Sequence, residues 1–184
     1  MYNFVIRSAN NFKNEHTYSL LFKSLVRSQL EYASPVWNPY YKCYIKDIER
    51  VQKKFLRYMN YNCNHSFISY EDLLKKYKLV DLNSRRLQLG AMLLYDICHN
   101  RYDCPELVNR LVYKVPFRIH SRTEQKSFFT ATRRTNPGQR SPLYRMTKSY
   151  NDHFNSIDIF HVRIGEFRRT VLEVLSGDGS KQST

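Results

Sequence analysis

Residues 18–59, YSLLFKSLVRSQLEYASPVWNPYYKCYIKDIERVQKKFLRYM, decide the expected fold. Apolar residues in the first half recur at spacings that place them on one face of a helix, with Thr17 as its expected N-cap. The second half repeats the pattern, and Pro35 and Pro39 separate the halves because proline ends a helix. Two amphipathic helices with a short link predict an antiparallel helical hairpin. Its apolar faces comprise Tyr18, Leu21, Phe22, Leu25, Val26 and Tyr32, then Ile45, Ile48, Val51, Gln52, Phe55, Leu56 and Met59.

The composition indicates a folded, strongly basic protein. The chain has 184 residues, 42% of them hydrophobic, which is enough for one domain with its own core. Thirty basic residues against sixteen acidic ones give a net charge of +14. Such an excess attracts polyanions, so nucleic acid is the first partner to expect and an anionic membrane surface the second. Fifteen tyrosines and eleven phenylalanines fill cores and also offer faces on which bases stack.

Further helices are expected after the hairpin. Ser69 to Asp72 resemble a capping box, which predicts the start of a short helix with Leu73 facing inward. Further apolar patterns predict a longer helix over residues 81–100, a short one over 106–113 and a last helix over 164–174. We therefore expect an all-α fold, an amphipathic helical bundle with the antiparallel hairpin at its core and a basic irregular segment before the last helix.

A row of basic residues follows another face of the second hairpin helix. Lys46, Arg50, Lys53 and Arg57 are spaced so that they form a positive stripe along that helix. The stripe is a candidate phosphate-binding surface, because lysine and arginine neutralise backbone phosphates. The alternative interpretation is an ordinary solvated helix face.

The segment 115–148 carries a second candidate group. Its periodicity fades, and basic residues alternate there with aromatic ones around an Asn136-Pro137-Gly138 turn. This composition suits an ordered loop on a phosphate backbone, with a mobile, charged linker as the alternative. The candidate contacts in this segment are Arg133, Arg134 and Arg140.

Three other residues admit two interpretations each. Arg85 and Arg86 either contact phosphate or form local salt bridges. Trp37 either stacks on a base or packs into the bend of the hairpin, and packing is the more common role of a lone tryptophan.

The residue types needed for catalysis do not occur in suitable patterns. No two of the eight aspartates are adjacent, and the sequence has neither a glycine-rich phosphate loop nor a G-x-S-x-G elbow. The four cysteines lack a CxxC spacing, which favours free thiols over a zinc site. We expect no catalytic residue, no bound metal and no cofactor in this chain.

The sequence also lacks membrane signals. No apolar run approaches the ~20 residues that a membrane-spanning helix requires. The first residues lack the apolar core of a signal peptide, so we expect an intracellular protein of the nucleus or cytoplasm.

Two phrases carry a resemblance to a known family. They are SLVRSQLEYASPVW at residues 24–37 and IERVQKKF at residues 48–55. Together they resemble the region just after the polymerase domain in reverse transcriptases of non-LTR (LINE, jockey-like) retrotransposons. Weaker likenesses are YEDL at 70–73, Leu79, Leu82, SRR at 84–86, RRTN at 133–136, SPLYRM at 141–146, YN at 150–151 and DIF at 158–160.

The resemblance implies a fragment of an RNA-directed DNA polymerase. In the family this thumb-like region would lie against the template–primer duplex, while an upstream domain holds Mg²⁺ on paired aspartates that this chain lacks. Its partners would be RNA, an RNA–DNA hybrid or a DNA backbone, and the upstream polymerase domain where present. The alternatives are a non-enzymatic basic helical interaction module, and a decayed element without selected function.

The resemblance and the patterns together give an expected organisation along the chain. A helical thumb-like domain follows a weakly ordered N-terminal segment, and a C-terminal helical segment packs back onto it. The expected bounds are 1–16 for the N-terminal segment, 17–114 for the thumb-like domain, 115–148 for the basic aromatic-rich loop, 149–175 for the C-terminal helical segment and 176–184 for a disordered tail.

Overall fold

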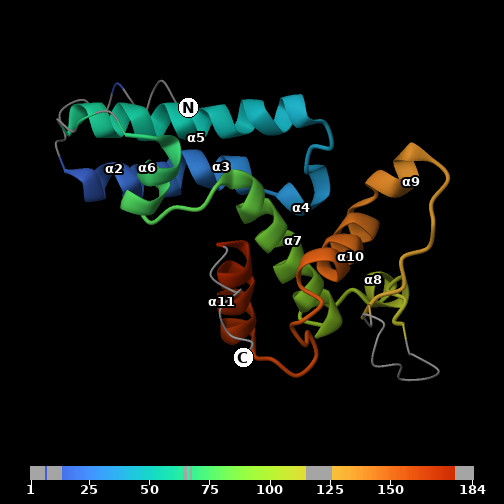
Figure 1. The fold of residues 1–184 in the computed structure, drawn as a ribbon. Coiled ribbons are helices and arrows are strands. Elements are labelled where there is room, and N and C mark those ends of the chain that lie inside the picture. Colours follow the sequence, from blue (N-terminus) through green and yellow to red (C-terminus); the bar gives the residue numbers. More distant parts are fainter. Residues whose placement is uncertain (1–6, 8–13, 64–65, 67, 115–125, 177–184) are drawn as a thin grey trace. The chain divides into compact units, whose positions relative to one another are not determined.

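The protein is helical, as the sequence predicts. A computed structural model describes residue 7 and residues 14–63, 66, 68–114 and 126–176. Helices dominate the described residues, and the β-pairing recorded among them is one antiparallel bridge between Tyr113 and Phe128. The expected all-α fold is therefore confirmed (Figure 1).

The chain divides into two compact units. Unit 1 comprises Met1–Ser34 and Asn38–Arg86, and unit 2 comprises Pro35–Trp37 and Leu87–Thr184. Helix α7 (Leu82–Cys98) begins in unit 1 and continues in unit 2. The division therefore lies inside the range 17–114 that the sequence analysis assigns to one domain.

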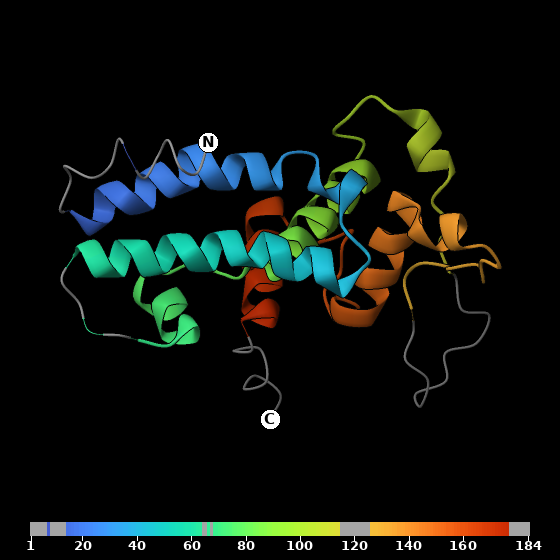
Figure 2. The same cartoon turned by 90° about the horizontal axis from the view of Figure 1, so that it is seen from above.

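Unit 1 is built on a helical hairpin. The first arm is α2 (Glu15–Leu21), the π-helical segment η1 (Phe22–Arg27) and α3 (Ser28–Glu31), and the second arm is α5 (Lys42–Asn62). Figures 1 and 2 show the arms side by side. Phe22 stacks on Phe55 with ring centroids 4.8 Å apart, while the earlier Tyr18 accepts a 2.8 Å hydrogen bond from the later Asn62. The arms are thus antiparallel, which confirms the predicted hairpin.

A short helix covers this hairpin. Helix α6 (Tyr70–Lys76) starts at Ser69, whose Oγ accepts from the Asp72 N–H at 3.3 Å, as the capping-box pattern predicts. Leu73 is 1% exposed and joins the core between the arms. The other buried members of that core are Tyr18, Phe22, Val26, Phe55, Leu56, Met59, Tyr77 and Leu79.

The first arm differs from its prediction in two ways. Its N-cap is Asn14, whose Oδ1 accepts from the His16 N–H at 2.8 Å, so the prediction of Thr17 was wrong. Leu25 and Tyr32 were expected on the apolar face but are 36% and 80% exposed. The π-helical turns of η1 change the register of the face, and the Ser24 hydroxyl bonds back to the Leu20 carbonyl at 2.9 Å.

Unit 2 packs its helices around the second part of α7. Its other elements are the residues 35–37 of α4 (Ser34–Trp37), α8 (Pro105–Asn109), α9 (Asn136–Arg140), α10 (Pro142–His153) and α11 (Ile164–Leu175). Tyr95 of α7 contacts Phe167 of α11, with ring centroids 4.9 Å apart. Phe167 and Val171 are both 0% exposed, so the predicted return of the last helix onto an earlier one is confirmed.

The basic segment is only partly irregular. Residues 115–125 lie outside the described residues, and residues 126–135 contain no helix. Residues 136–140 and 142–148, however, belong to α9 and α10, so the prediction of a loop there was wrong. Pro142 occupies the first turn of α10, where its missing N–H costs nothing and its fixed φ favours the helix. In the opposite sense, α8 ends at Asn109, short of the predicted end at residue 113.

We predict that Gly90→Ala stabilises the protein by about 1 kcal/mol, the cost of glycine in a helix interior. Gly90 lies in the middle of α7, and a Cβ there would meet Met146 Cγ at 3.6 Å, an ordinary contact. Urea unfolding followed by circular dichroism measures the change. Gly138→Ala is the matched control without gain, because its Cβ would lie 3.1 Å from Thr135 Oγ1 and disturb the α9 cap. A lower stability of Gly90→Ala would show that α7 and α10 cannot accept a methyl group.

Candidate nucleic-acid interface

Helix α5 presents an outer face rich in cations. Among its 21 residues, all described, six are basic and two, Asp47 and Glu49, are acidic. Glu49 is turned inward, so Asp47 is the exposed acid of this helix. Five of the six cations are exposed and Lys53 is half-buried. The basic members are Lys42, Lys46, Arg50, Lys53, Lys54 and Arg57.

The four predicted stripe residues lie on one continuous helix but differ in their surroundings. Lys46 and Arg57 are exposed. Arg50 Nη1 lies 3.3 Å from Asp47 Oδ1, with 65% of the Arg50 side chain exposed. Lys53 Nζ lies 5.6 Å from the centre of the Tyr70 ring. Because an exposed ion pair contributes about 0–1 kcal/mol, the Asp47 contact leaves Arg50 able to exchange its partner for a phosphate.

The second predicted group belongs to unit 2. Arg133 and Arg134 are exposed in the irregular residues before α9, and Arg140 is half-buried at the end of α9. The backbone carbonyl of Arg140 accepts from Arg145 Nε at 2.9 Å. The structure therefore assigns the predicted cations to two groups, one on α5 in unit 1 and one at α9 in unit 2.

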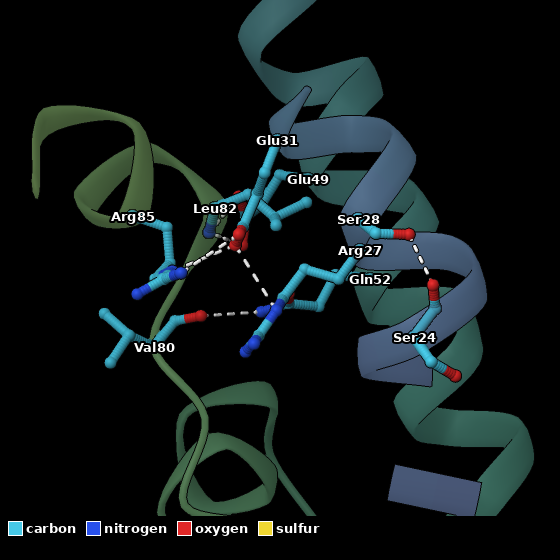
Figure 3. A network of polar contacts seen from close by, with 9 residues as sticks. All are labelled: Ser24, Arg27, Ser28, Glu31, Glu49, Gln52, Val80, Leu82 and Arg85. Atoms are coloured by element: carbon cyan, nitrogen blue, oxygen red, sulfur yellow. Dashed lines mark hydrogen bonds and ion pairs between the residues drawn. The ribbon is translucent and has the colours of Figure 1, made fainter. Parts of the chain in front are cut away.

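The adjacent arginines at the start of α7 have structural roles. Arg85 donates through Nε and Nη2 to the two carboxylate oxygens of Glu31, at 2.9 and 3.0 Å (Figure 3). Glu31 also lies 3.3 Å from Arg27 Nε. Arg86 is 2% exposed and donates to Asn38 Oδ1 at 3.0 Å. Of the two interpretations of this pair, the structure supports salt bridges and internal hydrogen bonds.

Buried polar groups fix the inner side of α5. Glu49 accepts from the Tyr70 hydroxyl and, at 3.1 Å, from the Leu82 N–H. Gln52 is 0% exposed and donates to the Val80 carbonyl at 3.0 Å (Figure 3). These contacts join α5 to α6 and to the start of α7. The helix therefore cannot rotate about its axis, and its cations keep facing outward.

Trp37, the single tryptophan, ends the short helix α4. Its side chain is 41% exposed, which leaves one part packed and another open to solvent. Packing and base stacking therefore both stay as predictions for this residue.

Across the described ranges, no group of three or more His, Cys, Asp and Glu side chains is arranged to hold a metal ion. All four cysteines are free in this structure; Cys43 is exposed, and Cys63, Cys98 and Cys104 are partly buried. No helix in the described part of the chain is long and apolar enough to cross a membrane.

Comparison with known proteins gives no relative. No protein-family model, curated protein or solved structure matches this chain. The resemblance to retrotransposon reverse transcriptases therefore rests on the quoted sequence phrases, and the functions that it implies are proposals.

We predict that Glu31→Gln lowers the free energy of unfolding by about 2–3 kcal/mol, because removing the shared carboxylate leaves two guanidinium groups facing each other. Glu31 is 13% exposed, and Arg27 and Arg85 are 23% and 22% exposed. Asp47→Asn is the matched control, since it breaks the exposed pair with Arg50 and should cost less than about 0.5 kcal/mol. Equal urea midpoints for the two variants would contradict this structural role.

We predict that Glu49 makes stability fall as pH rises above its ordinary pKa of 4.5. Burial raises the pKa of Glu49, and the nearby Asp81 carboxylate adds to the rise, although the Tyr70 and Leu82 hydrogen bonds oppose it. The folded state then holds its proton to higher pH than the unfolded state, so folding is favoured below this window and less favoured above it. Urea unfolding of the wild type and Glu49→Gln between pH 4.5 and 7 measures the difference. A wild type that gains stability relative to the variant with rising pH would contradict the sign.

Proposed function

We propose that this chain is part of an RNA-directed DNA polymerase of a non-LTR retrotransposon and binds the backbone of template–primer nucleic acid. The observation that carries the proposal is the outer face of α5, where five exposed cations accompany one exposed acid. The sequence resemblance supplies the polymerase context. In this proposal the chain is not itself an enzyme, it acts inside the cell in the nucleus or cytoplasm, and Mg²⁺ belongs to an upstream polymerase domain.

The length of the stripe fits a phosphate backbone. Lys46 and Arg57 are eleven residues apart on an uninterrupted helix, which corresponds to about 16 Å at 1.5 Å per residue. One strand of a duplex offers a phosphate about every 3.4 Å along its axis, so this length passes about five phosphates. Four cations over that length are a good match in spacing as well as charge.

The chemistry of the stripe favours binding without base recognition. Lysine and arginine side chains on a smooth helix face reach phosphates, whereas base readout needs side chains that enter a groove. An A-form hybrid has a deep, narrow major groove that side chains cannot read, so shape and charge govern its recognition. We therefore expect binding that is indifferent to sequence and strongly dependent on salt.

We predict that the triple variant Lys46→Gln, Arg50→Gln, Arg57→Gln flattens the salt dependence of binding to an RNA–DNA hybrid. Three lost phosphate contacts should reduce the log–log slope of affinity against salt by about 2–3. Lys53 is left in place because it also contacts the Tyr70 ring. Fluorescence anisotropy of a labelled hybrid over a range of salt concentrations measures the slope.

A second triple variant controls for net charge. Arg163→Gln, Arg168→Gln and Arg169→Gln remove three exposed cations at α11, and Arg169 pairs with Glu173 as Arg50 pairs with Asp47. This variant has the same net charge as the first and should keep a slope close to that of the wild type. Equal slopes for both variants would show that general charge, and not the α5 stripe, drives binding. The absence of any hybrid binding at low salt would reject the proposed function.

A further inference from the structure

Unit 2 contains a pocket of about 630 Å³. Its walls are formed by the second part of α7, by α8, by the first half of α10 and by the irregular residues 129–133. Leu93 and Ile97 of α7 and Met146 of α10 give it an apolar interior. The volume lies within the usual range for small-ligand sites, about 300–1,000 Å³.

Buried polar contacts hold the wall that contains Phe129. The Asn151 side chain is 4% exposed and bonds to both backbone groups of Phe128: its Oδ1 accepts from the N–H at 3.2 Å and its Nδ2 donates to the carbonyl at 2.8 Å. Phe128 is 1% exposed and lies in the core. Since successive side chains of extended backbone point to opposite sides, Phe129 faces the pocket, with 54% of its surface exposed.

A second wall is held in a similar way. Arg145 Nη2 donates to the Val36 carbonyl at 2.8 Å and to the Pro35 carbonyl at 3.1 Å. Burial lowers the pKa of the Arg145 guanidinium, which marks it as partly removed from water. These bonds fix Val36 at the pocket, where its side chain is 60% exposed. Hydrogen bonds from Asn151 and Arg145 therefore hold two walls of the pocket in place.

The side chains at the pocket combine exposed apolar surface with positive charge. Val36, Val112 and Phe129 come from three separate segments, are all at least 54% exposed, and converge on the pocket. Arg110 and Arg133 also line it and are exposed, which places them at its mouth. Among the described residues that line the pocket, none is acidic. An occupant should thus present a flat or apolar body together with negative charge.

We propose that this pocket takes an unstacked base of a single-stranded nucleic acid. The Phe129 ring supplies the face on which the base stacks. Arg110 and Arg133 bind the backbone phosphates that precede and follow the stacked nucleotide. A nucleotide satisfies both requirements of the pocket, because a planar ring is joined to anionic phosphates. Arg133 is also a candidate backbone contact, so this inference rests on the proposed function and extends it from duplex to unpaired strand.

The test compares two 12-nucleotide strands with the same phosphates, oligothymidylate and an abasic strand that has no bases. The full chain should bind oligothymidylate about tenfold more tightly at equal salt, since stacking contributes about 1–3 kcal/mol per base. Phe129→Ala should remove this preference. Phe160→Ala is the matched control and should retain it, because Phe160 is 47% exposed and lies outside the pocket lining.

A photo-crosslink supplies the location independently of any substitution. A strand with one 5-iodouracil should crosslink to the segment 126–147, which contains Phe129, Arg133 and Tyr144. Equal affinity for the two strands, or loss of the preference in Phe160→Ala alone, would overturn the inference. If the chain then still binds an RNA–DNA hybrid with a steep salt dependence, the proposed function stands without the pocket. If it binds neither strand nor hybrid, both fail.

Discussion

The inner side of α5 is the constraint on which the candidate interface depends. Phe55, Leu56 and Met59 are 0% exposed in the core of unit 1, and Gln52 and Glu49 bond to the chain that leads into α7. Burying three large apolar side chains contributes several kcal/mol, at about 1.5–3 kcal/mol each. A helix held in this way has one rotational setting. The direction of its cations therefore follows from the packing of its apolar residues.

Two acidic side chains of unit 1 face inward toward arginines, and this explains how so many cations can remain on its surface. A net charge of +14 destabilises a compact state by self-repulsion. Glu31 lies between Arg27 and Arg85 and offsets two cations in the interior of the unit. Glu49 likewise faces inward, near Arg86. Carboxylates used in this way cannot neutralise the outer face of α5, which stays positive as a consequence.

The features that depend on residues close together in the sequence could be predicted from local patterns. The hairpin, the cap at Ser69 and the return of Phe167 onto an earlier helix all follow from spacing of apolar residues and turn chemistry. Prolines were less informative, because the fixed φ and missing N–H of proline suit the first turn of a helix as well as a helix break. Pro142 begins the helix α10, where a loop was predicted. The π-helical register of η1 also left no signal in the periodicity.

Contacts between distant residues set the rest of the site. Arg85 meets Glu31 across 54 positions of sequence, so no local pattern could separate a salt bridge from a phosphate contact. The pocket depends on Arg145 reaching Val36 across 109 positions. The stripe on α5 was predictable because one helix carries it, although the Asp47 and Tyr70 contacts of its members were not.

Lysine footprinting tests the central claim most directly, because it measures whether bound nucleic acid covers one side chain of the α5 stripe in the wild-type protein. Acetylation of exposed lysines is compared with and without an RNA–DNA hybrid, and mass spectrometry reports each position. Lys46 on the outer face of α5 should be protected by the hybrid, while the exposed Lys78 after α6 should react as before. Unchanged reactivity of Lys46 in a saturated complex would contradict the account, since the nucleic acid would then be bound elsewhere.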